Sequence, residues 1–417
     1  MSLAEDEVRA ICAEFVEREG LGGKRVLGVI PDNTRSGPID VMFKTLYGLL
    51  GDRARALDFL IALGTHPPMT EQAIDRRLGL APGELAASYP KSRIFNHHWS
   101  DPSRLAKVGT ISGGRVAEIS GGMLHDPVHV TVNRMVFDYD VILIIGPTFP
   151  HEVVGFSGGN KYLVPGISGP EIIDMFHWLG ALITSPVIIG RKLTPVRTVI
   201  DTAAAMLPVP RLCMSLVTHA AGLAGLFCGT PEEAWSAAAD LSDRIHIVYK
   251  ERPYASVLSC APAMYGDLWV GGKAAYKLEP VVADGGEVIV FAPHIREISV
   301  THGTLIERIG YHVRDYFLDQ MDRFGDVPGG VLAHSTHVKG IGTYEDGCER
   351  PRTSVVLATG IPEATCRTIN LGYRDPATID PAAWKDREDE GYLHVPKAGE
   401  ILYRLRRDPF GAPPGVE

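Results

Sequence analysis

The chain has 417 residues, of which 45% are hydrophobic, and its 41 basic and 50 acidic residues give a net charge of −9. This apolar share is typical of a globular protein with a sizeable core, so the composition argues against intrinsic disorder, and the length predicts two or three domains. Because there is no basic excess, nucleic acid and anionic membranes are not expected as partners.

No apolar stretch is long enough to cross a membrane, and the acidic N-terminus does not have the pattern of a signal peptide. The six cysteines are scattered and form no CxxC pair, which argues against a zinc ribbon and against a disulfide framework. We therefore expect a cytoplasmic protein in a reducing compartment.

In the first half of the chain, apolar segments of strand length alternate with amphipathic segments of helix length. We expect helices at 4–18, 38–50, 70–78 and 170–179, and strands at 24–30, 56–63 and 141–145. This alternation predicts a parallel α/β sheet, in which ligands bind beyond the carboxyl ends of the strands.

Further helices, including one at 231–243, are expected between 190 and 250, and the α/β pattern starts again near Pro253. The later elements that we expect are strands at 255–259, 287–291, 353–358 and 366–370, a helix at 273–282 and a glycine-rich loop at 325–348. The pattern predicts two α/β domains, 1–252 and 253–417, with a cofactor and substrate site in the cleft between them. The C-terminal domain would close over the substrate, and the last residues are free to pack back on the N-terminal domain.

The most informative segment, 150–166, follows the buried strand at 141–145 and has the sequence PHEVVGFSGGNKYLVPG. Ser157, Gly158 and Gly159 allow backbone N–H groups to approach an anion or a phosphate, and Lys161 reaches the same site. On glycine content alone, a simple turn beside a solvated lysine explains the segment equally well. The chain lacks a Walker A loop, and no GxGxxG motif follows its first strand.

Three histidines lie near the expected ligand-binding edge of the sheet. His66 and His151 follow strands and could form a paired acid and base, because imidazole exchanges protons near neutral pH. His177 lies inside a predicted helix, where a buried structural histidine is the alternative. Arg35 could present its guanidinium to a carboxylate or phosphate, or form only a local ion pair with Asp32.

Two other histidine pairs have no assigned role. His97 and His98 are expected at the surface or behind the site, and His334 and His337 have helical spacing but no third metal ligand nearby. A metal at His334 and His337 is therefore not favoured.

Four motifs together resemble those of the nickel-pincer lactate racemase family, which comprises racemases and epimerases of 2-hydroxy acids. The similar segments are D-x-T-R at 32–35, G-x-H at 64–66, the 150–166 segment, and the helix histidine His177. Weaker similarity continues at 227–235 and near 257, so the resemblance covers nearly the whole chain.

The resemblance implies a role for each matching residue. Lys161 would tether the cofactor, a nickel complex of pyridinium-3,5-bisthiocarboxylic acid mononucleotide, and His177 would be the protein ligand of the nickel. His66 and His151 would be the catalytic acid and base on the two faces of the substrate. The remaining residues would contact the cofactor (Asp32, Asn33, Thr34, Arg35, Ser157, Gly158 and Gly159) or the substrate (Arg35 and Lys273).

The implied activity is inversion of C2 of a 2-hydroxy acid through hydride removal and return, an isomerase reaction. The C2 proton is only weakly acidic, so hydride transfer avoids a difficult deprotonation, and each enantiomer then needs its own acid/base. The resemblance also implies cofactor-making enzymes as partners, and it implies that protein expressed alone lacks the cofactor. The alternatives are a nickel-pincer protein without racemase activity, and a nucleotide- or phosphate-binding protein that uses the Ser157–Lys161 loop.

The chain departs from the family pattern around the predicted substrate. Pro67 follows His66 where arginine is expected, Asn160 replaces an arginine before Lys161, and Val270 stands where lactate-specific members carry glutamine. These changes predict a 2-hydroxy acid other than lactate, either larger or derived from a sugar.

Overall fold

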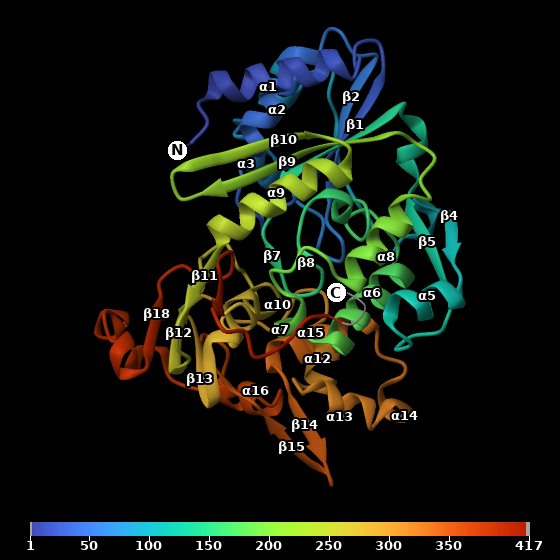
Figure 1. Cartoon of the computed structure of the whole chain (residues 1–417). Coiled ribbons are helices and arrows are strands. Elements are labelled where there is room, and N and C mark those ends of the chain that lie inside the picture. Colours follow the sequence, from blue (N-terminus) through green and yellow to red (C-terminus); the bar gives the residue numbers. More distant parts are fainter. Residues whose placement is uncertain (1, 414–417) are drawn as a thin grey trace.

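The computed structural model describes residues 2–413, and its centre is a six-stranded sheet with the strand order β10-β9-β6-β1-β2-β3 (Figure 1). All neighbouring strands are parallel except β9 and β10, which form an antiparallel edge. The strands are β1 (Arg25–Pro31), β2 (Ala56–Ala62), β3 (Ile94–Asn96), β6 (Val141–Pro147), β9 (Arg211–His219) and β10 (Gly222–Gly229).

Both faces of this sheet are buried. Along β6, Leu143 packs with α1, α2 and α3 on one face, and Ile142 and Ile144 pack with α5, α6 and α8 on the other. Successive side chains of a strand point to opposite faces, so a strand covered on both sides reads as a continuous apolar run. The covering helices are α1 (Glu5–Arg18), α2 (Ile39–Leu50), α3 (Glu71–Leu78), α5 (Gly113–Ser120), α6 (Pro170–Ile183) and α8 (Pro195–Ala204).

A second sheet has five parallel strands in the order β17-β16-β13-β12-β18. Its strands are β12 (Tyr254–Cys260), β13 (Val282–Ala292), β16 (Ser354–Thr359), β17 (Gly372–Tyr373) and β18 (Tyr392–Val395). Its helices are α10 (Leu268–Gly271), α11 (Lys273–Tyr276), α12 (Gly303–Ile309), α13 (Arg314–Leu318), α14 (Met321–Phe324), α15 (Gly329–Lys339) and α16 (Glu363–Thr368). The α/β class predicted from the sequence is therefore confirmed.

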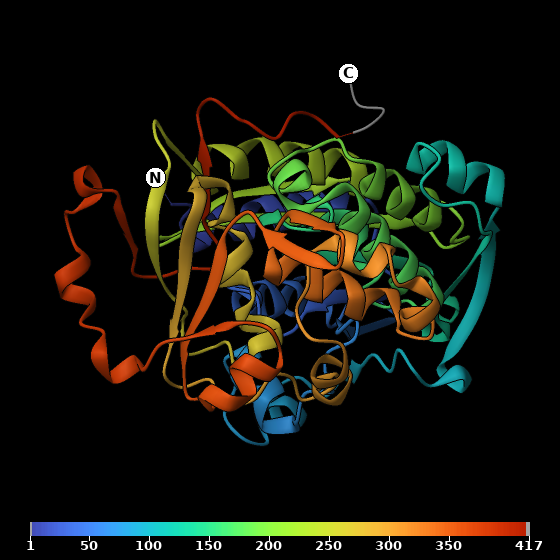
Figure 2. The same ribbon diagram turned by 90° about the horizontal axis from the view of Figure 1, so that it is seen from below.

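Four small two-stranded sheets and three further helices complete the structure. The paired strands are β4 (Leu105–Ile111) with β5 (Val128–Asn133), β7 (Pro150–His151) with β8 (Gly155–Phe156), β11 (Ile247–Lys250) with β19 (Leu402–Leu405), and β14 (Gly342–Glu345) with β15 (Cys348–Pro351). The helices are α4 (Glu84–Ser88), α7 (Ser185–Ile188) and α9 (Pro231–His246). The β4–β5 pair and the segment 376–390 lie at opposite ends of the molecule in both views (Figure 1 and Figure 2).

Segments that are far apart in the sequence join the two parts of the molecule. β19 pairs in parallel with β11, and the buried Arg404 of β19 donates hydrogen bonds to the carbonyls of Pro186 and Ile189 and pairs with Asp408. Helix α15 packs against α6, where the amide of Gly330 donates to Asp174 over 3.0 Å. The division into domains at residue 252 stays a prediction.

Most of the predicted elements of the first half lie where the sequence places them, but four predictions for later segments are wrong or incomplete. The region 190–250 also contains β9, β10 and β11, and the predicted helix at 273–282 is only the short α11 followed by a 3-10 turn at Glu279–Val281. The predicted loop at 325–348 contains the helix α15, and the predicted strand at 366–370 lies largely within the helix α16.

Close packing explains the most misleading of these segments, the glycines at the start of α15. A β-carbon on Gly329 would lie 2.6 Å from the carbonyl oxygen of Asp174 in α6. Glycine here permits contact between two helices, whereas its abundance in the sequence indicates a loop.

Among residues 2–413, no helix combines the length and apolar character that a membrane crossing requires. All six cysteines are free thiols, and Cys12, Cys213 and Cys366 are buried.

The contact of Arg404 with the 186–189 segment predicts a measurable contribution to stability. Replacement of this buried arginine in Arg404→Met leaves the carbonyls of Pro186 and Ile189 without their donor, while Asp408 keeps its pair with Arg191, so we expect the free energy of unfolding to fall by about 2–4 kcal/mol. Urea denaturation followed by circular dichroism measures this change. The control is Arg406→Met, which removes an exposed pair with Glu251 and should cost less than about 1 kcal/mol. Equal effects of the two substitutions would contradict the structural role of Arg404.

Candidate active site

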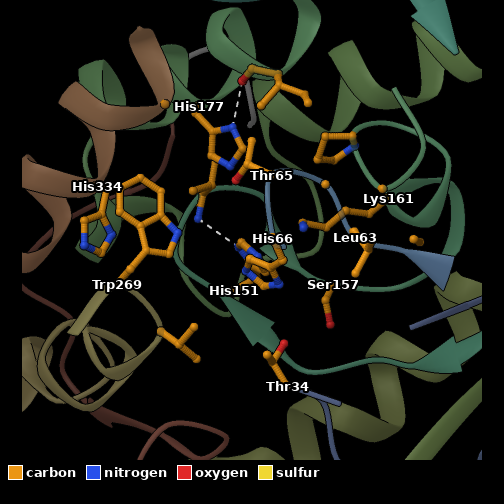
Figure 3. A pocket seen from close by; sticks show the side chains of 18 of the residues that line it. Thr34, Leu63, Thr65, His66, His151, Ser157, Lys161, His177, Trp269 and His334 are labelled. Atoms are coloured by element: carbon orange, nitrogen blue, oxygen red, sulfur yellow. Dashed lines mark hydrogen bonds between the residues drawn. The ribbon is translucent and has the colours of Figure 1, made fainter. Parts of the chain in front are cut away.

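A pocket of about 280 Å³ lies beyond the carboxyl ends of β1 and β2 and of the segment that follows β6. Residues between 31 and 177 line one side of it, and residues of α10, α11, α15 and the segment before α12 line the other. Figure 3 shows the labelled side chains around it. Most of the site residues predicted from the sequence line this pocket. They are Asp32, Thr34, Arg35, His66, His151, Ser157, Gly158, Lys161, His177 and Lys273.

His66 is held by the carboxylate of Asp32, which follows β1. Its Nδ1 lies 2.5 Å from Oδ2 of Asp32, and the hydroxyl of Thr34 donates to Oδ1 over 2.7 Å. Burial opposes ionisation of Asp32, but the charge and hydrogen bond of His66 and the hydroxyl of Thr34 outweigh it and lower the pKa of this carboxyl. The ionised carboxylate fixes the ring and leaves Nε2 of His66 as the nitrogen that can take up a proton.

His151 is bonded differently. Its Nδ1 accepts the amide of Val153 over 3.2 Å, which places the proton of the neutral ring on Nε2. Nδ1 also lies 3.1 Å from Oε2 of Glu152, although burial and the nearby Lys161 and Arg35 lower the pKa of His151 and keep it neutral. The two pocket histidines therefore have opposite tautomers: Nε2 of His66 can accept a proton, and Nε2 of His151 can donate a hydrogen bond.

The glycine-rich loop that carries Lys161 is fixed by buried groups behind it. Arg197 of α8 donates to the carbonyls of Phe156 and Gly158, and the indole N–H of Trp235 donates to the carbonyl of Ser157 over 2.9 Å. The guanidinium of Arg197 also lies 4.0 Å above the ring of Trp235. Gly158 has a φ of 91°, and a β-carbon there would lie 2.3 Å from the hydroxyl of Thr148.

The amine of Lys161 projects from this loop into the pocket (Figure 3). Burial, assisted by the positive charge of Arg35, lowers the pKa of Lys161 to about 7. A large share of the amine is therefore neutral at physiological pH, and a neutral amine is nucleophilic.

His177 lies in the middle of α6, and its Nδ1 donates to the carbonyl of Ile173 over 2.7 Å. Burial lowers the pKa of His177 to about 3, so the ring is neutral. This hydrogen bond fixes the tautomer and leaves the lone pair of Nε2 available for a metal, an arrangement common among metal-binding histidines.

Lys273 begins α11 on the opposite side of the pocket. It is 7% exposed, its Nζ has no hydrogen-bond partner, and it lies 5.1 Å from the centre of the Tyr265 ring. Burial and the charge of Arg35 hold the pKa of Lys273 well below its usual range. An unpaired buried amine at a pocket wall is suited to bind an anionic ligand.

Two of the predicted contact residues do not line this pocket. Asn33 is exposed and borders a neighbouring hollow, and Gly159 packs against Trp235, where a β-carbon would lie 2.7 Å from its side chain. Asn160, which departs from the family pattern, is buried and hydrogen-bonded to Asp201, Glu232 and Arg211. The side chain at 160 therefore serves the packing of the loop.

Several pocket residues were not identified from the sequence, and they lie mostly on segments whose structure was mispredicted. They are Glu152, Trp99, Trp269, Tyr276, His302, His334 and His337. The i,i+3 spacing of His334 and His337 was a usable signal, because it places both on one face of a helix, but the surrounding glycines indicated a loop.

Comparisons with known proteins agree with this geometry. The model of the lactate racemase N-terminal domain matches residues 11–187, which contain every predicted site residue except Lys273. The lactate racemase of Lactiplantibacillus plantarum is 25% identical over 178 residues, and that of Thermoanaerobacterium thermosaccharolyticum is 25% identical over 158 residues. These matches cover 42% and 37% of the chain, and the chain spans 37% and 33% of the two relatives.

The structural comparisons cover nearly the whole chain. The crystal structure of a protein from Thermotoga maritima is 33% identical with a TM-score of 0.89, and the match covers 97% of this chain and 99% of that one. The lactate racemase apoprotein from T. thermosaccharolyticum shares the fold, with 16% identity, a TM-score of 0.71, and coverage of 97% and 93%.

The protein is thus an α/β protein with two main sheets and a pocket lined by histidines and lysines. Residues 11–187 match the lactate racemase N-terminal domain, and the chain is similar to lactate racemases over this region.

The lowered pKa of Lys161 predicts unusual reactivity towards acylating reagents. With acetic anhydride, labelling of Lys161 should rise between about pH 6 and pH 8 and then level off, because the neutral amine reacts. Peptide mass mapping measures labelling at each pH. Lys91 is the control, since its bond to Asp52 raises its pKa and its labelling should still rise above pH 9 or so. Parallel curves for the two lysines would contradict the proposed environment of Lys161.

Proposed function

We propose that this protein is a racemase or epimerase that inverts C2 of a 2-hydroxy acid with a nickel-pincer nucleotide attached to Lys161. The observation that carries the proposal is that Lys161, His177, His66 and His151 all line one pocket, although they come from three separate segments of the chain. Similarity to lactate racemases supports racemisation, and the altered residues Pro67 and Val270 support a substrate other than lactate.

The residues present fit the proposed cofactor. A partly neutral lysine amine can be acylated, and His177 has one ring nitrogen free for a metal. Among residues 2–413, no group of three or more His, Cys, Asp or Glu side chains is arranged to hold a metal, so further donors would have to come from the cofactor. Thiocarboxylate sulfur together with imidazole is a donor set that suits nickel(II).

When bound, the nickel complex would supply an electrophilic ring carbon that accepts the C2 hydrogen of the substrate with its electron pair. The chain would supply the substrate contacts and the proton transfers. Arg35 presents a cationic group for the substrate carboxylate, and Lys273 presents an amine that can hydrogen-bond to it. Holding the carboxylate would keep the planar 2-keto acid in place until the hydrogen returns.

The two histidines would act on the substrate hydroxyl from opposite sides. His66 can receive the hydroxyl proton on Nε2 while Asp32 stabilises the imidazolium that forms. His151 holds a proton on Nε2 and can donate a hydrogen bond from it to the substrate oxygen. To serve as the base for the other enantiomer, its ring would change tautomer so that Nε2 is free to take up the hydroxyl proton. In each direction the histidine that took up the proton would return it to the oxygen once C2 has regained its hydrogen, so the protons balance over a turnover.

Cofactor attachment is tested by intact mass after co-expression with cofactor-making enzymes. Wild-type protein should carry an adduct of several hundred daltons on Lys161, and both Lys161→Ala and Lys161→Arg should carry none, because neither variant offers an acylable amine. Lys192→Ala, which removes a lysine paired with Asp240, is the control and should load normally. Activity that survives unchanged in Lys161→Ala would overturn the tether.

Nickel retention tests His177 separately. His177→Ala should keep the adduct but lose most of its nickel by metal analysis, because the only protein ligand proposed here is removed. Nickel that stays stoichiometric would make His177 a structural residue.

The catalytic histidines are tested by optical purity. His66→Ala and His151→Ala should each slow inversion of single-enantiomer hydroxy acids by about 10²–10⁴-fold, which is the usual contribution of a positioned acid or base, and should leave the adduct intact. His98→Ala, at an exposed position, is the control. Full inversion by either catalytic variant would remove that residue from the mechanism.

A further inference from the structure

One wall of the pocket contains rings that the proposed acid/base and cofactor chemistry does not use. We call Trp269, His302, His334 and His337 the aromatic subsite; all four line the pocket. The ring of Trp269 stacks on His334 at 3.9 Å between ring centres and lies 4.5 Å from His302. Figure 3 shows the indole nitrogen of Trp269 on the side of the ring that faces the pocket.

The backbone is shaped to put these rings there. A β-carbon on Gly272 would lie 2.7 Å from Val338 and 3.3 Å from His334, so glycine lets the chain between α10 and α11 touch α15. This contact places Trp269 one turn before Lys273 at the same pocket. The pair of glycines that interrupts the helix expected from the sequence therefore builds the wall.

His337 is the member of the subsite that points most directly to a ligand. It is 5% exposed, its Nε2 has no hydrogen-bond partner, and its side chain lines the pocket. It faces the carboxylate of Glu152 and the ring of Tyr276, which also line the pocket. Leaving a buried polar group unpaired costs about 1–3 kcal/mol, and a ligand that hydrogen-bonds to it recovers this energy.

The charges nearest the subsite disfavour a second carboxylate on the ligand. The groups whose charges act on the pKa values of His302, His334 and His337 are histidines and the carboxylates Asp267 and Glu152, with no lysine or arginine. The cations Arg35 and Lys161 act on Glu152, the same carboxylate that acts on His337. The pocket thus offers cations for one carboxylate, together with neutral rings and a hydrogen-bond acceptor for the rest of the molecule.

We propose that the aromatic subsite and Glu152 bind hydroxyl groups on C3 and C4 of the substrate, so that the substrate is a polyhydroxylated 2-hydroxy acid, an aldonic acid. This inference rests on the proposed racemase function. The indole N–H of Trp269 faces the pocket and donates to a substrate hydroxyl, and the hydroxyls also bond to the neutral imidazoles and to the carboxylate of Glu152. An alkyl or aryl substituent would leave Nε2 of His337 unpaired, and a dicarboxylate would meet the negative charge of Glu152.

The test uses the cofactor-loaded full chain and four single-isomer substrates: a six-carbon aldonic acid, 2-hydroxybutanoate, phenyllactate and malate. Inversion at C2 is followed by chiral chromatography. We expect kcat/KM for the aldonic acid to exceed that for each of the others by at least about tenfold, the factor that corresponds to one net hydrogen bond. Equal or faster inversion of 2-hydroxybutanoate, phenyllactate or malate overturns the subsite but leaves the racemase function standing. If the cofactor-loaded protein inverts none of the four acids, both the subsite and the racemase function are overturned.

Variants locate the effect within the pocket. His337→Leu should lower kcat/KM for the aldonic acid about tenfold or more, leave that for 2-hydroxybutanoate within about threefold, and keep the Lys161 adduct at the wild-type level. The matched control is His98→Leu at an exposed position. Loss of the adduct in His337→Leu would assign the residue to the cofactor, and equal loss with both substrates would make it structural; either result overturns the proposal.

Discussion

The site depends on positive charges that are buried beside very few carboxylates. Removal from water disfavours the charged form of an amine, and neighbouring cations disfavour it further, so the lysines of the pocket lose much of their affinity for protons. The same burial keeps His151, His177 and His337 neutral, while Asp32 and Glu152 stay ionised because hydrogen bonds and neighbouring positive charge outweigh their burial. Reactive amines, neutral imidazoles and two fixed negative charges are thus consequences of one arrangement: Arg35, Lys161, Lys273 and Lys277 gathered around Asp32 and Glu152.

Such a cluster needs a rigid frame, and the frame comes from residues outside the pocket. The loop before Lys161 is held by the guanidinium of Arg197 and the indole of Trp235, which stack on each other. Glycine is required at 158 because Thr148 and Trp235 leave no space for a side chain. The lysine therefore projects from a loop with little conformational freedom. Such preorganisation lowers the entropic cost of bringing the reacting groups together.

The sequence was most informative where local pattern and ligand geometry agree. The apolar run at 141–145 is buried on both faces, as its continuous hydrophobicity indicates, and the polar residues Asp32 and His66 that follow two parallel strands meet at 2.5 Å. Parallel strands end at the same edge of a sheet, so this meeting could be predicted from chain order.

The opposite wall could not be predicted in the same way. His337 lies in a helix whose first residues are glycines, and glycine content indicates a loop unless the partner helix is known. The close contact with Asp174 explains why position 329 requires glycine. Likewise, Glu152 looks like any surface carboxylate in the sequence, and its importance follows from Arg35 and His337, which distant segments bring to it, and from Lys161 in its own segment.

The contact of α15 with α6 also bears on how the pocket could be adjusted. Helix α6 carries His177 and α15 carries the histidines of the facing wall, so the distance between their axes sets the width between the metal-binding side and the opposite side of the pocket. Gly329 lies at this contact, two turns before His337 along α15. Any side chain introduced at 329 would push α15 away from α6. Its size would set the width of the pocket without changing any residue that lines it.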